Sequence, residues 1–222
     1  MPLSTSRWKL LRRLGRQLAR YKVHVARRVA HQANPRIRYD AVVGNIRMAI
    51  QAKRDIVVGT TGWDKYLPEF RGSVKESGLL YASNFSLGVN LFFRMAKQAA
   101  ALMNRAEEYD PYVHEIHHRQ KVDSPSGTAL TLAHILVHGI DRKSEILTHP
   151  PDRKIKSDAL HVSSTRVGTV AGMHVVGFDS DADTIELKHV AKSRRGFALG
   201  ALAAARWLRG RKGIYTMDDV EL

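Results

Sequence analysis

Residues 115–129 read Glu-Ile-His-His-Arg-Gln-Lys-Val-Asp-Ser-Pro-Ser-Gly-Thr-Ala, with two histidines, an arginine and a lysine inside five consecutive positions. The Ser-Pro-Ser-Gly-Thr turn predicts the start of a helix, because Ser124 or Ser126 can cap it and Pro125 cannot continue a helix backwards. Unpaired N–H groups at a helix start bind carboxylate or phosphate. The stretch therefore predicts a site for a small anion, beside an imidazole that can exchange a proton near neutral pH.

The same residue types also fit a solvated basic loop, so spacing alone leaves both interpretations open. A shared metal ion is not expected, because the adjacent His117 and His118 would point to opposite faces of a strand. The chain has no cysteine, which excludes a thiolate zinc site. We therefore predict no metal at this stretch.

Upstream of the stretch, the hydrophobic pattern predicts a βα arrangement typical of a doubly wound sheet. The expected order is helix, strand, helix and strand, over residues 41–54, 55–59, 63–76 and 78–82. The loops that follow the two strands begin at Gly59 and Ser83. Ligands of doubly wound sheets bind beyond the carboxyl ends of the strands, which is where both loops would lie.

Downstream, the pattern predicts an α+β domain with a mixed sheet. A helix over 90–107 would bury a face of Leu91, Met95, Ala99 and Leu102, and a helix over 129–138 would follow the capping turn. Strands are expected at 112–116, 161–166, 173–178 and 184–190, a loop at 141–158, a helix at 196–208 and a polar tail at 211–222.

We thus expect an α/β chain with an incomplete Rossmann-like nucleotide domain and a separate α+β domain. The expected boundaries are 1–40 for a basic segment, 41–88 with 196–222 for the nucleotide domain, and 89–195 for the second domain.

The net charge of +15 is concentrated at one end of the chain. Residues 1–39 hold eleven Lys and Arg and no acidic residue, which leaves +4 for the remainder. This segment fits a targeting signal, a basic arm for nucleic acid or a membrane surface, or a displaced start that replaces a first strand. It has few aromatic residues, which argues against nucleic acid. No apolar run approaches the roughly 20 residues of a membrane span, so we expect no membrane partner and a cytoplasmic protein.

The stretch 115–129 resembles the signature of the 4-hydroxy-tetrahydrodipicolinate reductases, also called dihydrodipicolinate reductases. These enzymes use NADH or NADPH in the diaminopimelate route to lysine. Three further segments, 57–63, 82–90 and 194–201, resemble the same family in the same order, and the likeness runs from about Ala41 to the end. The resemblance implies a small dicarboxylate substrate and a homo-oligomer, commonly a tetramer joined through the sheet of the second domain.

The resemblance also implies roles for individual residues. His117 would be the general acid, Lys121 would hold a substrate carboxylate and support the proton donor, and His118 would bind substrate. A second carboxylate would lie on Ser126, Gly127 and Thr128. The cofactor would contact Gly59, Thr60, Thr61, Ala82, Ser83, Asn84 and Phe85, and Arg194 would meet one of its phosphates.

One feature of the family is missing from the sequence. Family members open with a strand, a glycine-rich turn and a helix that hold the cofactor pyrophosphate. Before Gly59 this chain has only Gly15 and Gly44, and neither follows a plausible apolar strand. Three interpretations stay open: an active reductase, an impaired relative that cannot hold the dinucleotide, and a binder that uses its basic arm. The preference between NADH and NADPH cannot be predicted.

Overall fold

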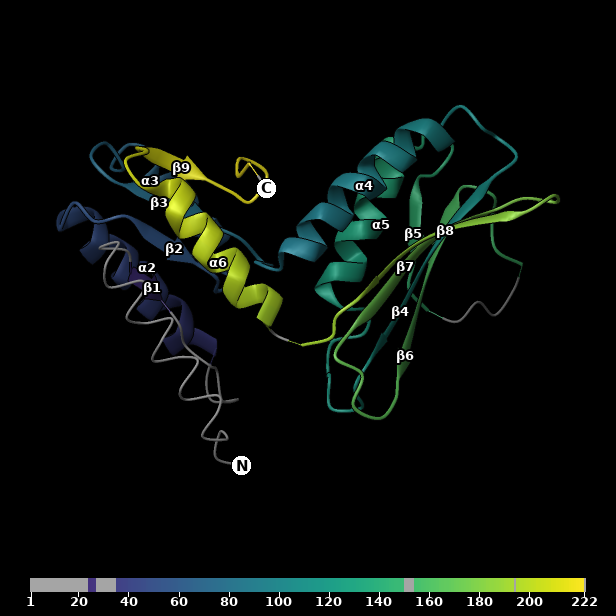
Figure 1. Ribbon diagram of the computed structural model, residues 1–222, viewed down its shortest axis with the longest axis horizontal. Coiled ribbons are helices and arrows are strands. Elements are labelled where there is room, and N and C mark those ends of the chain that lie inside the picture. The colour runs from purple at the N-terminus through teal and green to yellow at the C-terminus, as the bar shows by residue number, and fades with distance from the viewer. Residues whose placement is uncertain (1–23, 27–34, 150–153, 194, 222) are drawn as a thin grey trace. The chain divides into compact units, whose positions relative to one another are not determined.

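The computed structural model describes residues 24–26, 35–149, 154–193 and 195–221 (Figure 1). The chain divides into two compact units, Met1–Ser86 with Phe197–Leu222, and Leu87–Gly196. Each unit has its own sheet and its own cluster of buried apolar side chains. The expected α/β fold class, with a parallel sheet in one unit and a mixed sheet in the other, is confirmed.

The first unit contains a parallel sheet in the order β1-β2-β3-β9. Its strands are β1 (His24–Ala26), β2 (Ile56–Val58), β3 (Gly78–Tyr81) and β9 (Gly213–Tyr215). Its helices are α2 (Pro35–Gln51), η1 (Asp64–Tyr66), α3 (Leu67–Phe70) and most of α6 (Arg195–Leu208). Ile46, Ile56, Trp63, Phe70 and Leu79 form the centre of a core between α2 and the sheet.

Four expectations for this unit were wrong. A strand, β1, does precede β2. The first helix begins at Pro35 and not at residue 41. The helix expected over 63–76 is reduced to η1 and α3, since Gly72 favours a turn and the Ser73 hydroxyl bonds to the Phe70 carbonyl at 3.1 Å. The polar tail contains β9, whose three residues are too few to show a strand pattern.

The second unit is a mixed sheet in the order β5-β6-β4-β7-β8. The strands are β4 (Asp110–His117), β5 (Glu145–Leu147), β6 (Ala159–Arg166), β7 (Met173–Asp179) and β8 (Thr184–Val190). The central strand β4 is parallel to β6 and antiparallel to β7. Helices α4 (Leu87–Met103) and α5 (Gly127–Gly139) lie on one side of the sheet (Figure 1).

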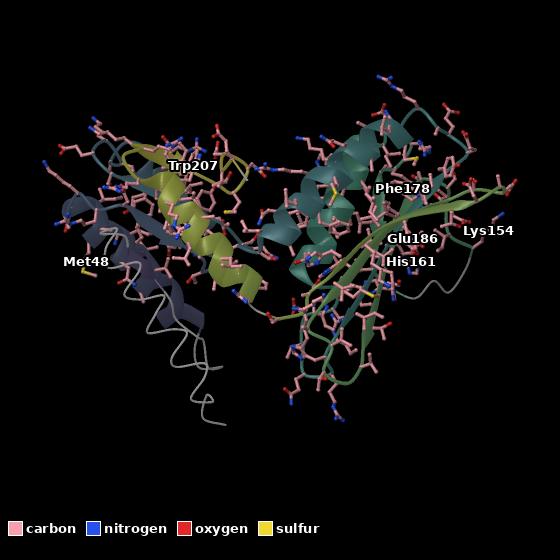
Figure 2. The ribbon with its side chains drawn as sticks, in the orientation of Figure 1. Met48, Lys154, His161, Phe178, Glu186 and Trp207 are labelled. Atoms are coloured by element: carbon pink, nitrogen blue, oxygen red, sulfur yellow. The ribbon has the colours of Figure 1, made fainter. Side chains whose placement is uncertain are left out.

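The core of this unit lies between those two helices and the sheet. Val113 of β4, Val162 of β6 and Val176 of β7 point toward the helices and are almost fully buried. Phe178, at the end of β7, belongs to the same core (Figure 2). Side chains alternate across a strand. Residues two positions away from these valines on the same strands therefore also face the helices.

The buried face of α4 differs from the expected one. Leu91, Met95 and Leu102 are 44%, 49% and 69% exposed, whereas Phe92 and Ala96 lie in the core. Both stripes have helical spacing, so periodicity could not decide between them. The stripe with small side chains is the buried one, because small side chains let α5 pack closely against α4. A Cβ at Gly139 of α5 would lie only 2.8 Å from the Cβ of Ala100 on α4.

The predicted loop 141–158 contains β5, another three-residue strand that the sequence pattern missed. Arg194 and residues 150–153 lie outside the described residues, as do most of residues 1–34. Among the described residues, no helix has the length and apolar character needed to cross a membrane.

The contact between Gly177 and Tyr112, which face each other on β7 and β4, gives a stability prediction. A Cβ at Gly177 would lie 2.2 Å from the Tyr112 ring. Gly177→Ala should therefore lower the free energy of unfolding by about 1–3 kcal/mol, measured by urea denaturation. The matched change Gly44→Ala, inside α2 with no atom within 4 Å of the new methyl group, should raise it by up to about 1 kcal/mol. An unchanged midpoint for Gly177→Ala would contradict this packing.

Candidate active site

The pairing of β4 with its two neighbours assembles a cluster of polar side chains. Glu115 and His117 are two positions apart on β4, so both point to the side of the sheet covered by the helices. Ser164 on β6 and His174 on β7 lie directly opposite Glu115. Arg166 on β6 lies opposite His117. Three strands thus bring one acid, one hydroxyl and three basic groups to the same face.

The Glu115 side chain is fully buried but has several hydrogen-bond partners. Arg166 Nη2 donates to Oε1 at 2.7 Å, and the Ser126 N–H donates to the same oxygen at 3.0 Å. Burial alone would raise the pKa of Glu115. The donors from Arg166, Ser164 and Ser126 outweigh burial and lower the pKa to about 2. Glu115 is therefore a carboxylate at neutral pH.

The second oxygen of Glu115, Oε2, contacts Nδ1 of His117. The His117 side chain is 10% exposed, and its ring meets that of His174 edge to face, with centroids 5.0 Å apart. Burial lowers the pKa of His117, the negative charge of Glu115 raises it, and the positive charges of Lys121 and Arg166 lower it further. The net direction is downward, which makes the protonated imidazole a stronger acid than a free histidine.

Ser126 joins this cluster to the start of α5. Its side-chain oxygen caps the helix by accepting from the Ala129 N–H at 3.2 Å, and the same oxygen lies 3.2 Å from His174 Nε2. Burial lowers the pKa of His174 to about 4, so this histidine is neutral at physiological pH. The N–H and hydroxyl of Ser126 both have protein partners, which makes Ser126 part of the frame of the site.

The start of α5 and Lys121 already hold a carboxylate, that of Asp123. Lys121 Nζ donates to the two oxygens of Asp123 at 2.7 and 2.8 Å. Partial burial would raise the pKa of Asp123, but Lys121 and the Gly127 N–H lower it. Beyond Gly127 the space is open, since a Cβ there would meet no atom within 4 Å. Lys121 and the helix start thus form a carboxylate-binding position next to His117.

Two other expected residues border this position. Thr128 lies in the first turn of α5 and is half-buried. His118 follows the end of β4, and its backbone carbonyl accepts from the Lys121 N–H at 3.0 Å. The Nδ1 atom of His118 is buried and has no hydrogen-bond partner among the described residues. A buried polar atom without a partner is a plausible contact for a ligand.

One group among the described residues has the spacing of a metal site: ligand atoms of Glu115, His117 and His174 all lie within 4.8 Å of one another. The contacts present favour a different use. Glu115 is already paired with Arg166, and the cations of Arg166 and Lys121 would repel a metal ion beside them. This grouping could not be predicted from local patterns, because His174 lies far from Glu115 and His117 in the chain.

The expected cofactor residues lie in the first unit, on two loops at the carboxyl ends of neighbouring strands. Val58 pairs with Tyr81, and the Ala82 N–H donates to the Val58 carbonyl at 3.1 Å, so both loops begin side by side. The Phe85 ring packs on Gly59, where a Cβ would lie 3.3 Å from the ring. The structure thus brings together the two groups of residues, Gly59, Thr60 and Thr61 with Ala82, Ser83, Asn84 and Phe85.

The internal bonds of these loops hold their backbone in place. Trp63 Nε1 donates to the Thr60 carbonyl at 2.8 Å, and the Ser86 N–H donates to Asn84 Oδ1 at 2.9 Å. Thr61 and Ser83 are exposed. The prediction for Arg194 concerns a residue outside the described part of the chain.

Comparison with known proteins identifies the family of this chain. A family model described as "Dihydrodipicolinate reductase, C-terminus" matches residues 88–220. The 4-hydroxy-tetrahydrodipicolinate reductase of Christiangramia forsetii is 43% identical over 182 residues, which cover 81% of this chain and 74% of that protein. The 4-hydroxy-tetrahydrodipicolinate reductase of Aquifex aeolicus is 40% identical over 182 residues, which cover 81% of this chain and 68% of that protein. The chain belongs to the dihydrodipicolinate reductase family.

A solved structure agrees at the level of the fold. The dihydrodipicolinate reductase of Paenisporosarcina sp. TG-14, determined with dipicolinate bound, superposes with a TM-score of 0.69. It is 22% identical and covers 88% of this chain and 71% of its own. The family resemblance predicted from residues 115–129 is confirmed by the family model and by the two relatives.

Five residues of the site were not predicted from the sequence: Glu115, Asp123, Ser164, Arg166 and His174. Glu115 had a usable signal, since it stands two positions before His117 and a strand was expected there. Asp123 lies inside the quoted stretch, but its pairing with Lys121 depends on how the loop folds. Arg166 and His174 come from other strands, and only the strand register reveals them.

The ion pair between Glu115 and Arg166 gives a pH-dependent stability prediction. Arg166→Met leaves a buried carboxylate without its cation, so the free energy of unfolding near neutral pH should fall by about 3 kcal/mol. The pKa of Glu115 is lower in the folded chain than in the unfolded chain, so its stabilisation is present above about pH 4.3 and is lost as the pH falls toward 2. The deficit of the variant should therefore shrink in acid.

Urea denaturation across this pH range measures the effect. Arg119→Met, at an exposed position of the loop after β4, is the control and should cost less than about 0.5 kcal/mol. A deficit of the same size at neutral and acidic pH would contradict the assignment of an ionised Glu115.

Proposed function

We propose that this chain catalyses the reduction of 4-hydroxy-tetrahydrodipicolinate to tetrahydrodipicolinate with NADH or NADPH, a step of diaminopimelate and lysine biosynthesis in the cytoplasm. Family membership supports the reaction. The observation that carries the proposal is the position of Asp123. Its carboxylate lies on Lys121 and on the start of α5, beside a buried imidazole.

A dicarboxylate substrate suits the charges of the second unit. One substrate carboxylate would replace that of Asp123 on Lys121 Nζ and the Gly127 N–H, since the Asp123 side chain is 58% exposed and can turn into solvent. Thr128 in the first helical turn would add a hydroxyl group. His118, through its buried Nδ1, would bind a second polar group of the substrate. Charge-assisted hydrogen bonds of this kind are stronger than neutral ones.

His117 is the proposed proton donor. Its Nδ1 faces Glu115, so Nε2 is the nitrogen left for the substrate. When bound, the nicotinamide cofactor would supply the hydride. The reaction also takes up one proton and releases the 4-hydroxyl group as water. The lowered pKa of His117 favours release of that proton. The Lys121 ammonium group would stabilise negative charge on the substrate before the proton arrives.

The first unit supplies residues that fit the nicotinamide part of the cofactor. Gly59 is exposed and leaves its backbone open, while the Phe85 ring forms one wall of the loop. Such a position, beyond the carboxyl ends of parallel strands, suits a flat ring. Residues 27–34, which precede α2 in the sequence and lie outside the described residues, include Arg27 and Arg28 but no glycine. We propose that the dinucleotide binds along this edge without a glycine-rich turn.

We also propose that the chain forms a homo-oligomer through the open face of the second sheet. Ile116, Met173 and Val190 lie opposite one another on β4, β7 and β8, and they point away from α4 and α5. Val190 is 53% exposed. His161 and Glu186, labelled in Figure 2, are on the same face by register. An apolar row across a sheet face that the helices of this unit do not cover is a suitable contact for a second copy.

Steady-state kinetics of two variants test the proposed function, because one variant should change mainly kcat and the other mainly KM. His117→Gln should lower kcat about 10²- to 10⁴-fold with a small change in KM, because it removes the proton donor. Lys121→Met should raise KM for the dicarboxylate about 10- to 100-fold, the loss expected for one charge-assisted hydrogen bond. The assay follows the absorbance of NADH or NADPH.

Lys97→Met, at an exposed position of α4, is the control and should behave as the wild type. Absence of turnover by the wild type with both cofactors, at saturating substrate, would contradict the proposed reaction. It would leave the chain as a relative that binds the dicarboxylate but not the dinucleotide.

A further inference from the structure

We propose that Glu115 is a positioning residue, whose buried carboxylate fixes His117 with its proton on Nδ1 and holds the start of α5 at the same time. The inference rests on the proposed function, because it concerns how the proton donor of that reaction is oriented. Glu115 does not touch the substrate in this account. It acts through His117 and through the backbone of Ser126.

The two oxygens of Glu115 have separate partners. Oε1 accepts from Arg166 and from the Ser126 N–H, at 2.7 and 3.0 Å. Oε2 contacts His117 Nδ1. One rigid group therefore sets the position of the imidazole relative to the helix start that would hold the substrate carboxylate. Placement of reacting groups at a defined separation is a recognised source of rate enhancement.

The hydrogen-bond donors to Oε1 also determine whether Oε2 accepts or donates a hydrogen bond. Because donors hold the pKa of Glu115 far below neutral, its oxygens only accept hydrogen bonds. The group facing Oε2 must then donate, so Nδ1 of His117 carries a proton in both the neutral and the charged imidazole. Nε2 becomes the nitrogen that gains a proton from solvent, gives it to the reduced substrate and returns to the neutral form.

The groups around His117 come from every element packed against it. Glu115 on β4 stabilises the imidazolium, whereas Arg166 on β6 and Lys121 on the following loop oppose it. His174 on β7, whose pKa is lowered to about 4, adds no charge beside the ring at neutral pH. Asp123 partly neutralises Lys121. Glu115 is thus the negative charge in direct contact with the ring among the described residues. Without it, burial and the neighbouring cations would disfavour the charged form.

Glu115→Gln tests the inference and preserves the shape of the site. The amide oxygen can still accept from Arg166 and Ser126, so its NH₂ group would face His117 Nδ1 and demand an acceptor there. His117 would shift to the tautomer with its proton on Nε2. We expect kcat to fall about 10²- to 10⁴-fold, the usual contribution of a general acid, because the shifted tautomer is no longer set up to donate from Nε2. KM for the dicarboxylate should change by less than about threefold.

The pH profile separates positioning from a merely structural role. Activity should decline above the pKa of His117, and in Glu115→Gln this decline should move about one pH unit or more toward acid, since the charge that favours the imidazolium is gone. Glu107→Gln, at an exposed position in the turn after α4, is the matched control and should leave kcat, KM and the profile unchanged. A profile that keeps its midpoint in Glu115→Gln would overturn the inference.

A measurement on the wild type does not depend on turnover or on the folding of a variant. Imidazole ¹⁵N NMR, with His117 assigned by comparison with His117→Gln, reports which ring nitrogen carries the proton. We expect a protonated Nδ1 throughout the titration and a titrating Nε2. A neutral His117 protonated on Nε2 would overturn the inference even if the enzyme is active. The expected tautomer in a chain without turnover would instead count against the proposed reaction alone.

Discussion

A single buried carboxylate, that of Glu115, constrains the arrangement of the whole site. Burying an ion costs several kcal/mol unless partners replace its hydration, and here the partners come from β6, β7 and the start of α5. The strands must therefore pair in this register, and the helix must start where it does. The ionic cluster sits at the end of an apolar core that also holds these elements together.

The same constraint links stability to chemistry. Ser126 uses its N–H for Glu115 and its hydroxyl for the helix cap, so the following N–H groups face outward toward an anion. Lys121 meets the carboxylate of Asp123 at that position. A site that binds a carboxylate of its own chain is well suited to a carboxylate of a ligand, and exchange of one for the other needs no rearrangement of the frame.

Much of this fold could be predicted from the sequence, and the failures have physical causes. The capping turn at Ser126 and the strands that flank it could be predicted from local patterns, namely capping residues and the spacing of apolar residues. Strands β5 and β9 were missed because three residues carry no periodicity. The prediction for the buried face of α4 was wrong because Leu91 and Phe92 belong to two apolar stripes with the same helical spacing. Only the packing of α5 shows that the stripe with Phe92 is buried. Within the site, Arg166 is 51 positions from Glu115, a distance that no local rule spans.

In this arrangement Glu115 holds the proton donor and the anion position as one unit. A crystal structure of the chain with dipicolinate, a stable dicarboxylate, tests it most directly. We expect one carboxylate on Lys121 Nζ and on the N–H groups at the start of α5, with Asp123 turned away and Glu115 still in contact with His117 Nδ1. Dipicolinate bound elsewhere with the Lys121–Asp123 pair intact, or Glu115 turned away from His117, would contradict it.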